Sequence, residues 1–154
     1  MHIFSNKVVF KFNTIEMMSR LINGTYPDTS KLIPTDFSLS IKTNFNDFYE
    51  AIDRASLLTN EADKNTIKFS STNNDVIISS NIPEIGNIEE KLKVTKNNKE
   101  EIKIAFSSKY MMDAIKSLNC EEIELLFNGE IKPIIVKNPD SDDLIQLILP
   151  IRTY

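Results

Sequence analysis

Hydrophobic and polar residues alternate along much of this chain, and the pattern predicts most of its secondary structure. Alternation with a period of two is typical of strands that bury one face. Such segments predict strands at residues 37–42, 66–71, 76–80, 88–94, 102–106, 122–127 and 133–137, and a near-continuous apolar run predicts a further strand at residues 144–150. Apolar residues spaced three and four apart predict two helices, which run to about Leu58 and to about Leu118.

Each predicted helix follows a residue that can cap it. Asn44 or Asn46 precedes the first helix, and Ser107 or Ser108 precedes the second. The order strand–helix–three strands therefore occurs twice, which indicates an internal duplication of about 55–60 residues, judged by the spacing of the helices. Long antiparallel strands with two helices on one face make an α+β domain.

The first 33 residues do not fit this repeat. Residues 2–12 read as one or two short strands and residues 15–22 as another, before the turn signal Asn23-Gly24. A lone hairpin is only marginally stable in water. We therefore expect residues 1–33 to be the C-terminal remnant of one domain plus a linker, and residues 34–154 to form a second, complete domain.

The last predicted strand is apolar on both faces. Its run from Leu144 to Ile151 is broken only by Gln146 and Pro150. Such a strand should be buried on both faces within a sheet, and pairing should weaken at Pro150, which has no N–H to donate. Residues 149–152 would then lie at a sheet edge beside solvent, which suggests a docking site.

Composition and charge narrow the possible functions. The 154 residues carry a net charge of −4 with a pI near 5.1, so any contact with DNA requires a local basic face. The single Cys120 cannot form an internal disulfide and fits a reducing cytoplasm. The sequence contains no Gly-rich phosphate loop, no signal peptide and no run of about 20 apolar residues.

The sequence also shows no pattern of catalytic or metal-binding residues. His2 stands alone near a terminus, and Asp140, Asp142 and Asp143 lack the spacing of a calcium loop, so they read as a solvated turn. We expect no cofactor, no metal site and no catalytic residues. An enzyme is therefore the least favoured class.

Four ordered motifs resemble the bacterial DNA sliding clamp, the β subunit of DNA polymerase III. They are Leu21 to Asp28 with Leu32-Ile33-Pro34, Arg54 to Glu61, Phe106 to Tyr110 with Asp113 and Ala114, and Leu147 to Tyr154. The resemblance places residues 1–33 at the end of the second clamp domain and residues 34–154 in the third. It implies the DNA-clamp fold and a non-catalytic processivity factor, a ring of two chains that encloses duplex DNA and tethers the replicative polymerase.

The resemblance also implies a pocket for short peptides of partner proteins. In the family these partners are the DNA polymerase III α subunit, the clamp loader, other polymerases and mismatch-repair proteins. The matching positions are Pro27, Lys31, Leu32, Ser107, Tyr110, Ile131, Pro133, Leu147, Leu149, Pro150, Ile151 and Arg152. The alternative for Leu147 and Leu149 is that they are simply core residues.

Further positions match the ring's inner surface and its subunit contact. Lys109 and Lys116, seven residues apart on one helix face, and more weakly Lys64, are expected to face phosphates, unless they are ordinary solvated lysines. Leu57 and Leu58 match the contact between subunits.

Because the first clamp domain lies outside this sequence, we expect no normal homodimeric ring to close. A second hypothesis is therefore a free-standing short protein that competes for clamp-binding peptides without encircling DNA.

Overall fold

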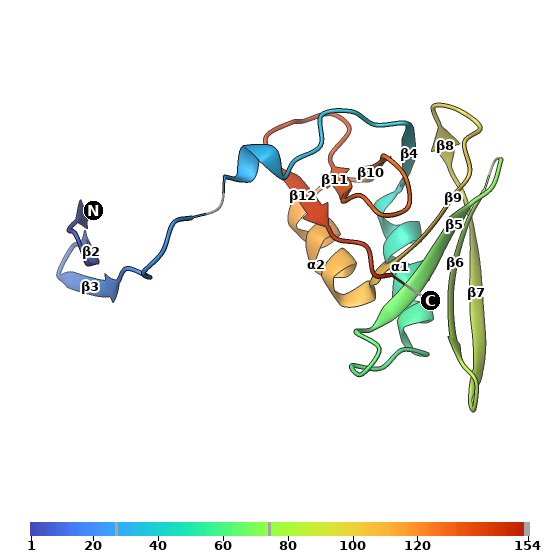
Figure 1. Ribbon diagram of the computed structural model, residues 1–154, viewed down its shortest axis with the longest axis horizontal. Coiled ribbons are helices and arrows are strands. Elements are labelled where there is room, and N and C mark those ends of the chain that lie inside the picture. The colour runs from blue at the N-terminus through green and yellow to red at the C-terminus, as the bar shows by residue number, and fades with distance from the viewer. Residues whose placement is uncertain (27, 74, 153–154) are drawn as a thin grey trace. The chain divides into compact units, whose positions relative to one another are not determined.

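The computed structural model describes residues 1–26, 28–73 and 75–152, with the side chain of Ser30 left aside (Figure 1). By its internal contacts the chain divides into two units, residues 1–32 and 33–154. Each unit is described by itself.

The first unit is a three-stranded antiparallel sheet followed by a short 3-10 helix. Its strands are β1 (His2–Ile3), β2 (Lys7–Phe12) and β3 (Ile15–Arg20), in the order β1-β2-β3, and the 3-10 helix is Thr29–Lys31. The two predicted strand regions are therefore confirmed.

One face of this sheet is apolar, and its side chains are exposed. The register places Phe10 opposite Met17 and Phe12 opposite Ile15, and these four side chains are 39% to 73% exposed. Directly opposed residues point to the same face of an antiparallel pair. The other face carries the ion pair between Lys11 and Glu16, whose charged atoms are 3.1 Å apart.

The described residues of the second unit form two helices and nine strands. In chain order they are β4 (Leu39–Asn44), α1 (Phe45–Ser56), β5 (Thr66–Ser71), β6 (Asp75–Ile82), β7 (Gly86–Lys93), β8 (Thr95–Lys96), β9 (Ile102–Ser107), α2 (Ser108–Leu118), β10 (Glu122–Phe127), β11 (Ile134–Lys137) and β12 (Ile145–Ile148). Both predicted helices and all the predicted strands are present. The short β8, which pairs with β4, was not predicted.

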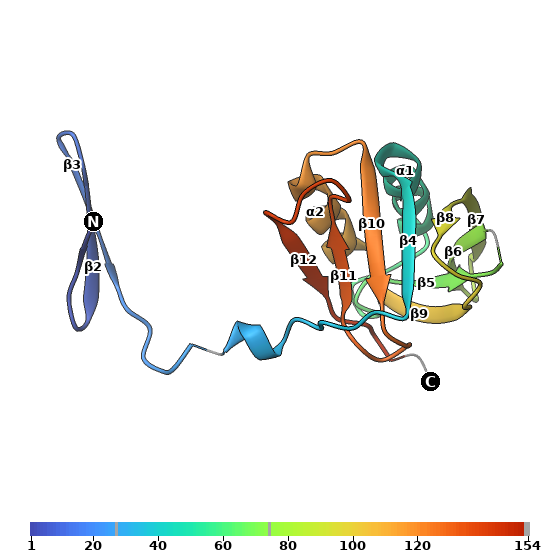
Figure 2. The ribbon, with the colours of Figure 1, turned by 90° about the horizontal axis from the view of Figure 1, so that it is seen from above.

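The two sheets of this unit exchange their first strands. One sheet has the order β12-β11-β10-β4-β8 and the other β7-β6-β5-β9, so β4 pairs with β10 and β9 pairs with β5. The predicted duplication is visible in this arrangement, because each sheet combines the first strand of one repeat with the last three of the other. Helix α1 packs on β6 and β7, and α2 packs on β11 and β12 (Figure 2).

The two repeats differ in the connection that follows the helix. Helices α1 and α2 begin at residues 45 and 108, a spacing of 63 rather than the predicted 55–60, whereas β5 and β10 begin 56 residues apart, at 66 and 122. Most of the difference lies in residues 57–65, which connect α1 to β5, against residues 119–121 after α2. The longer connection in the first repeat becomes important for the site.

Phe69 lies at the centre of the core. Its ring centroid is 6.5 Å from that of Phe48 on α1, 6.2 Å from that of Phe106 on β9 and 5.3 Å from that of Phe127 on β10. All four rings are fully buried. This cluster joins one helix to both sheets, and burying each ring contributes roughly 2–3 kcal/mol.

The structure decides between the alternative helix caps. The side chain of Asn44 accepts hydrogen bonds from the N–H groups of Asn46 (2.8 Å) and Asp47 (3.2 Å), so Asn44 caps α1. The Oγ of Ser107 accepts a longer bond of 3.5 Å from the N–H of Tyr110, so Ser107 caps α2. No helix in the described part of the chain is long and apolar enough to cross a membrane.

Candidate functional site

Strand β12 and the residues after it connect the edges of the two sheets. The register with β11 ends at the pair Ile134–Ile148. Beyond Pro150, the N–H of Ile151 donates a 2.7 Å hydrogen bond to the carbonyl oxygen of Ala105 in β9. The prediction that sheet pairing weakens toward Pro150 is confirmed.

The prediction that this strand is buried on both faces is wrong. Of β12 only Ile148 is buried, while Ile145 to Leu147 are half-buried and Leu149 is 67% exposed. The reason is that β12 forms the edge of its sheet, so its outer side has no neighbouring strand among the described residues. An exposed leucine beside an unpaired strand edge is available for contact with another molecule.

A groove of about 720 Å³ lies between this C-terminal segment and the start of α2. Tyr110, 66% exposed, and Leu149 offer large apolar surfaces to it. Its lining comprises Glu61, Lys64, Asn65, Ser107, Lys109, Tyr110, Leu147, Ile148, Leu149, Pro150 and Ile151. An apolar groove with polar groups at its rim suits a peptide that inserts apolar side chains.

The groove brings together six of the positions predicted for peptide binding, which are Ser107, Tyr110, Leu147, Leu149, Pro150 and Ile151. Ile131 and Arg152 line a neighbouring hollow of about 440 Å³, and half-buried Pro133 directly precedes β11. Lys31 and Leu32 belong to the first unit and are exposed there. Pro27 lies outside the described residues.

The connection from α1 to β5 supplies groove residues that the sequence analysis did not assign to it. Lys64 and Asn65 adopt positive φ angles of 57° and 51°, and the carbonyl oxygen of Asn65 accepts hydrogen bonds from the N–H and the Oγ of Ser108. These bonds hold the connection against the start of α2. The only sequence signal for them was the greater length of this connection in the first repeat.

The lysines predicted to face DNA occupy two different surroundings. Lys64 and Lys109 line the groove. The Nζ of Lys116 lies 4.9 Å from the ring centroid of Tyr49, which in turn stacks on Phe45 at 5.9 Å. The interaction with Tyr49, followed by the nearby carboxylates, raises the pKa of Lys116, so this amino group is charged at neutral pH. Its role toward DNA remains a prediction.

Leu57 and Leu58, predicted at the subunit contact, differ in exposure. Leu57 directly follows α1 and is 75% exposed, whereas Leu58 is half-buried and lines a hollow of about 390 Å³ beside β5 and β6. The two side chains therefore do not share one core, as expected. Their role in assembly remains a prediction.

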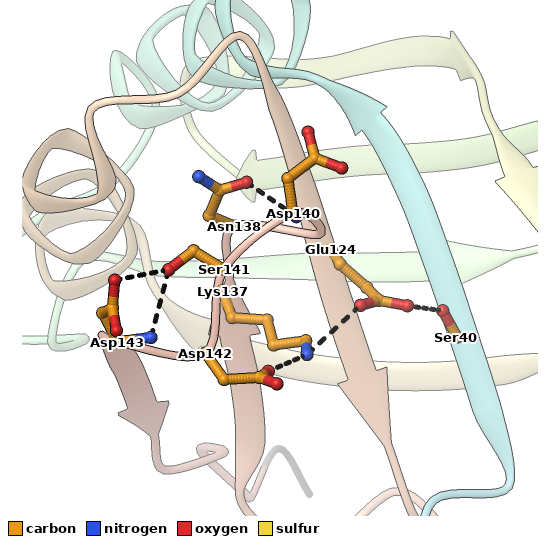
Figure 3. A network of polar contacts seen from close by, with 8 residues as sticks. All are labelled: Ser40, Glu124, Lys137, Asn138, Asp140, Ser141, Asp142 and Asp143. Carbon is orange, nitrogen blue, oxygen red and sulfur yellow. Dashed lines mark hydrogen bonds and ion pairs between the residues drawn. The ribbon is translucent and has the colours of Figure 1, made fainter.

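A polar network fixes the turn that leads into β12 (Figure 3). The Nζ of Lys137 lies 2.5 Å from a carboxylate oxygen of Asp142 and 3.9 Å from one of Glu124. The hydroxyl of Ser40 donates to Glu124 at 2.6 Å. The contact with Asp142 raises the pKa of Lys137. Among the described residues no group of three or more acidic, His or Cys side chains is arranged to hold a metal ion.

The amino-acid sequence matches a known protein family over most of its length. Residues 30–152 match the model of the family described as the DNA polymerase III beta subunit, C-terminal domain. The chain belongs to this family. The predicted resemblance and the DNA-clamp fold are thereby confirmed, and the relatives are named as sliding clamps.

Several relatives and solved structures are similar over nearly the whole chain. The sequence is 47% identical over 150 residues to the beta sliding clamp of Staphylococcus epidermidis and 45% identical to that of Staphylococcus aureus, covering 97% of this chain. The sliding clamp structure from Bacillus subtilis superposes with a TM-score of 0.90 at 43% identity over 99% of this chain, and the beta chain from Streptococcus pneumoniae with 0.89 at 32% over 99%. The chain spans about 40% of the length of these relatives.

Proposed function

We propose that residues 33–154 dock partner proteins of the replication machinery, as part of a sliding clamp that tethers the replicative polymerase to duplex DNA. The observation that carries this proposal is the apolar groove lined by Leu149 and Tyr110. The side chains of both residues are about two-thirds exposed. Exposed apolar and aromatic side chains beside a hollow are typical of peptide-docking sites.

The chemistry of the groove favours a short peptide with apolar anchors. Leu147, Leu149 and Ile151 offer apolar surface, and Lys64, Lys109 and Glu61 offer polar groups near it. The family resemblance supplies the candidate partners, which are the DNA polymerase III α subunit, the clamp loader, other polymerases and mismatch-repair proteins. The family resemblance also assigns Pro27, Lys31 and Leu32 to peptide binding, and this assignment remains a prediction.

The contacts of the ring with DNA and between subunits also belong to this proposal. Lys116, and with it Lys109 and Lys64, would contact phosphates without reading sequence, and such contacts weaken as salt increases. Exposed Leu57 and half-buried Leu58 would lie against the neighbouring subunit.

A second candidate function is competition for clamp-binding peptides without encircling DNA. One observation favours it: all eleven residues that line the groove lie in the second unit. Peptide binding at this groove therefore requires no closed ring.

Titration of a fluorescent clamp-binding peptide, containing Gln, Leu and Phe, tests the proposal. The full chain should bind it saturably, and Leu149→Asp should weaken binding by at least about tenfold, because a charge replaces an apolar anchor in the groove. Ile85→Asp is the matched control, since Ile85 is 70% exposed and lines no part of the groove. Absence of binding to the parent chain, or equal binding by Leu149→Asp and the parent, would contradict the proposal.

A further inference from the structure

A second hollow adjoins the groove on the outer side of β9. It has a volume of about 440 Å³, and Ile151 lines both hollows, so the two adjoin at this residue. Ile131, 69% exposed, is the apolar side chain at its margin. A peptide that leaves the first groove past Ile151 therefore enters this second hollow.

Among the described residues, no strand pairs with β9 on the side where Ile151 contacts it. β9 is the edge strand of its sheet, and the N–H of Ile151 already donates to the carbonyl oxygen of Ala105 from that side. Backbone groups of a strand alternate between its two sides, so the N–H and C=O of Lys103, two residues earlier, face the same side. Such an edge pairs with an extended peptide backbone.

The charged side chains around the hollow are mainly cationic. Lys68, Lys103 and Arg152 line it, against the single carboxylate of Glu130. Lys68 and Lys103 project on the outer face of the sheet, because their neighbours Phe69 and Ile104 are buried in the core. Within the described residues, the recorded ion pairs include none of the three cations.

We propose that this hollow binds an acidic extension of the docked peptide, which runs along β9 and places carboxylates near Lys68, Lys103 and Arg152. The inference rests on the proposed function, because the apolar anchors of the same peptide occupy the first groove. An open strand edge recognises a peptide backbone, which a nucleic acid lacks, and the exposed Ile131 suits a peptide better than a phosphate chain.

The test compares the unextended peptide with peptides that carry three Asp or three Ser residues at either end, titrated against the full chain. One Asp-extended peptide should bind about three- to tenfold more tightly than its Ser-extended counterpart, as expected for a few exposed ion pairs. Raising the salt concentration should reduce this gain. If neither Asp extension tightens binding, the inference is wrong.

Reversing the charge of a lysine in the hollow tests where the acidic extension binds. Lys103→Glu should abolish the gain from the Asp extension while leaving the unextended peptide's affinity unchanged. Lys93→Glu is the matched control, because Lys93 is an exposed lysine on β7, at the opposite edge of the same sheet, and it should retain the gain. If the Asp-extended peptide still binds Lys103→Glu more tightly than the Ser-extended peptide does, the inference is wrong. This holds even if the variant has lost affinity for duplex DNA. Failure of the unextended peptide to bind the parent chain would instead overturn the proposed function and the inference with it.

Discussion

At the scale of single residues, the amino group of Lys96 connects two neighbouring chain segments by hydrogen bonds. Its Nζ donates to the carbonyl oxygens of Thr72 (2.9 Å) and Glu100 (2.5 Å) and to the Oγ of Ser71 (3.3 Å). Thr72 follows β5 and Glu100 precedes β9, so the half-buried lysine ties together the ends of two paired strands.

Replacing Lys96 by Met keeps the aliphatic stem and removes the donor. The free energy of unfolding should fall by about 1–2 kcal/mol, because the part-buried carbonyl group of Thr72 and the Oγ of Ser71 lose this donor. Chemical denaturation measures this loss. Lys99→Met is the control, since Lys99 is exposed and no side-chain hydrogen bond is recorded for it. Equal losses in the two variants would show that the hydrogen bonds of Lys96 contribute no net stability.

At the scale of elements, the start of α1 depends on one side chain. The side-chain oxygen of Asn44 accepts hydrogen bonds from two backbone N–H groups. Asn46 lies inside the first turn, and its backbone N–H is one of these two donors. Asn44→Ala should therefore lower the free energy of unfolding by about 1 kcal/mol, and Asn46→Ala should change it by less than about 0.5 kcal/mol. Thermal or chemical denaturation compares the two. A larger loss in Asn46→Ala would contradict the assigned cap.

The elements themselves were largely predictable because their signals are local. The two helices and most strands of the repeat follow from periods of 3.6 and 2, the candidate caps from residue type, and the last strand from an apolar run, and a short window of sequence contains each of these signals. The pairing of β4 with β10 and of β5 with β9 joins residues from different repeats, and no local pattern encodes it. β8 was missed for the same reason, since two residues carry no period and only its pairing with β4 defines it.

The groove was predictable only in part. Leu149 and Tyr110 were named from motifs, and the edge position of Leu149 followed from Pro150. The contributions of Glu61, Lys64 and Asn65 were missed, because the α1–β5 connection has no periodic pattern and joins the groove through hydrogen bonds from Ser108 to Asn65.

At the scale of the whole molecule, the two units differ in how completely they bury their apolar residues. The main hydrophobic cluster, from Leu39 to Ile148, lies entirely in the second unit. The sheet of the first unit leaves Phe12 73% and Ile15 65% exposed. We propose, as the sliding-clamp resemblance implies, that residues 1–33 correspond to the end of the second clamp domain plus the linker.

The most direct test of the account is to map the bound peptide on the whole chain by NMR. A labelled 154-residue protein, titrated with the unextended peptide, should show its largest backbone shift changes around Leu149, Ile151 and Tyr110 and in residues 64–65. The backbone shifts around Lys91 and Lys93 should change little, because these residues lie on β7, at the opposite edge of the sheet from β9. Shifts concentrated on β7, on α1 or on residues 1–26, with the groove unchanged, would contradict the claim that this groove is the docking site.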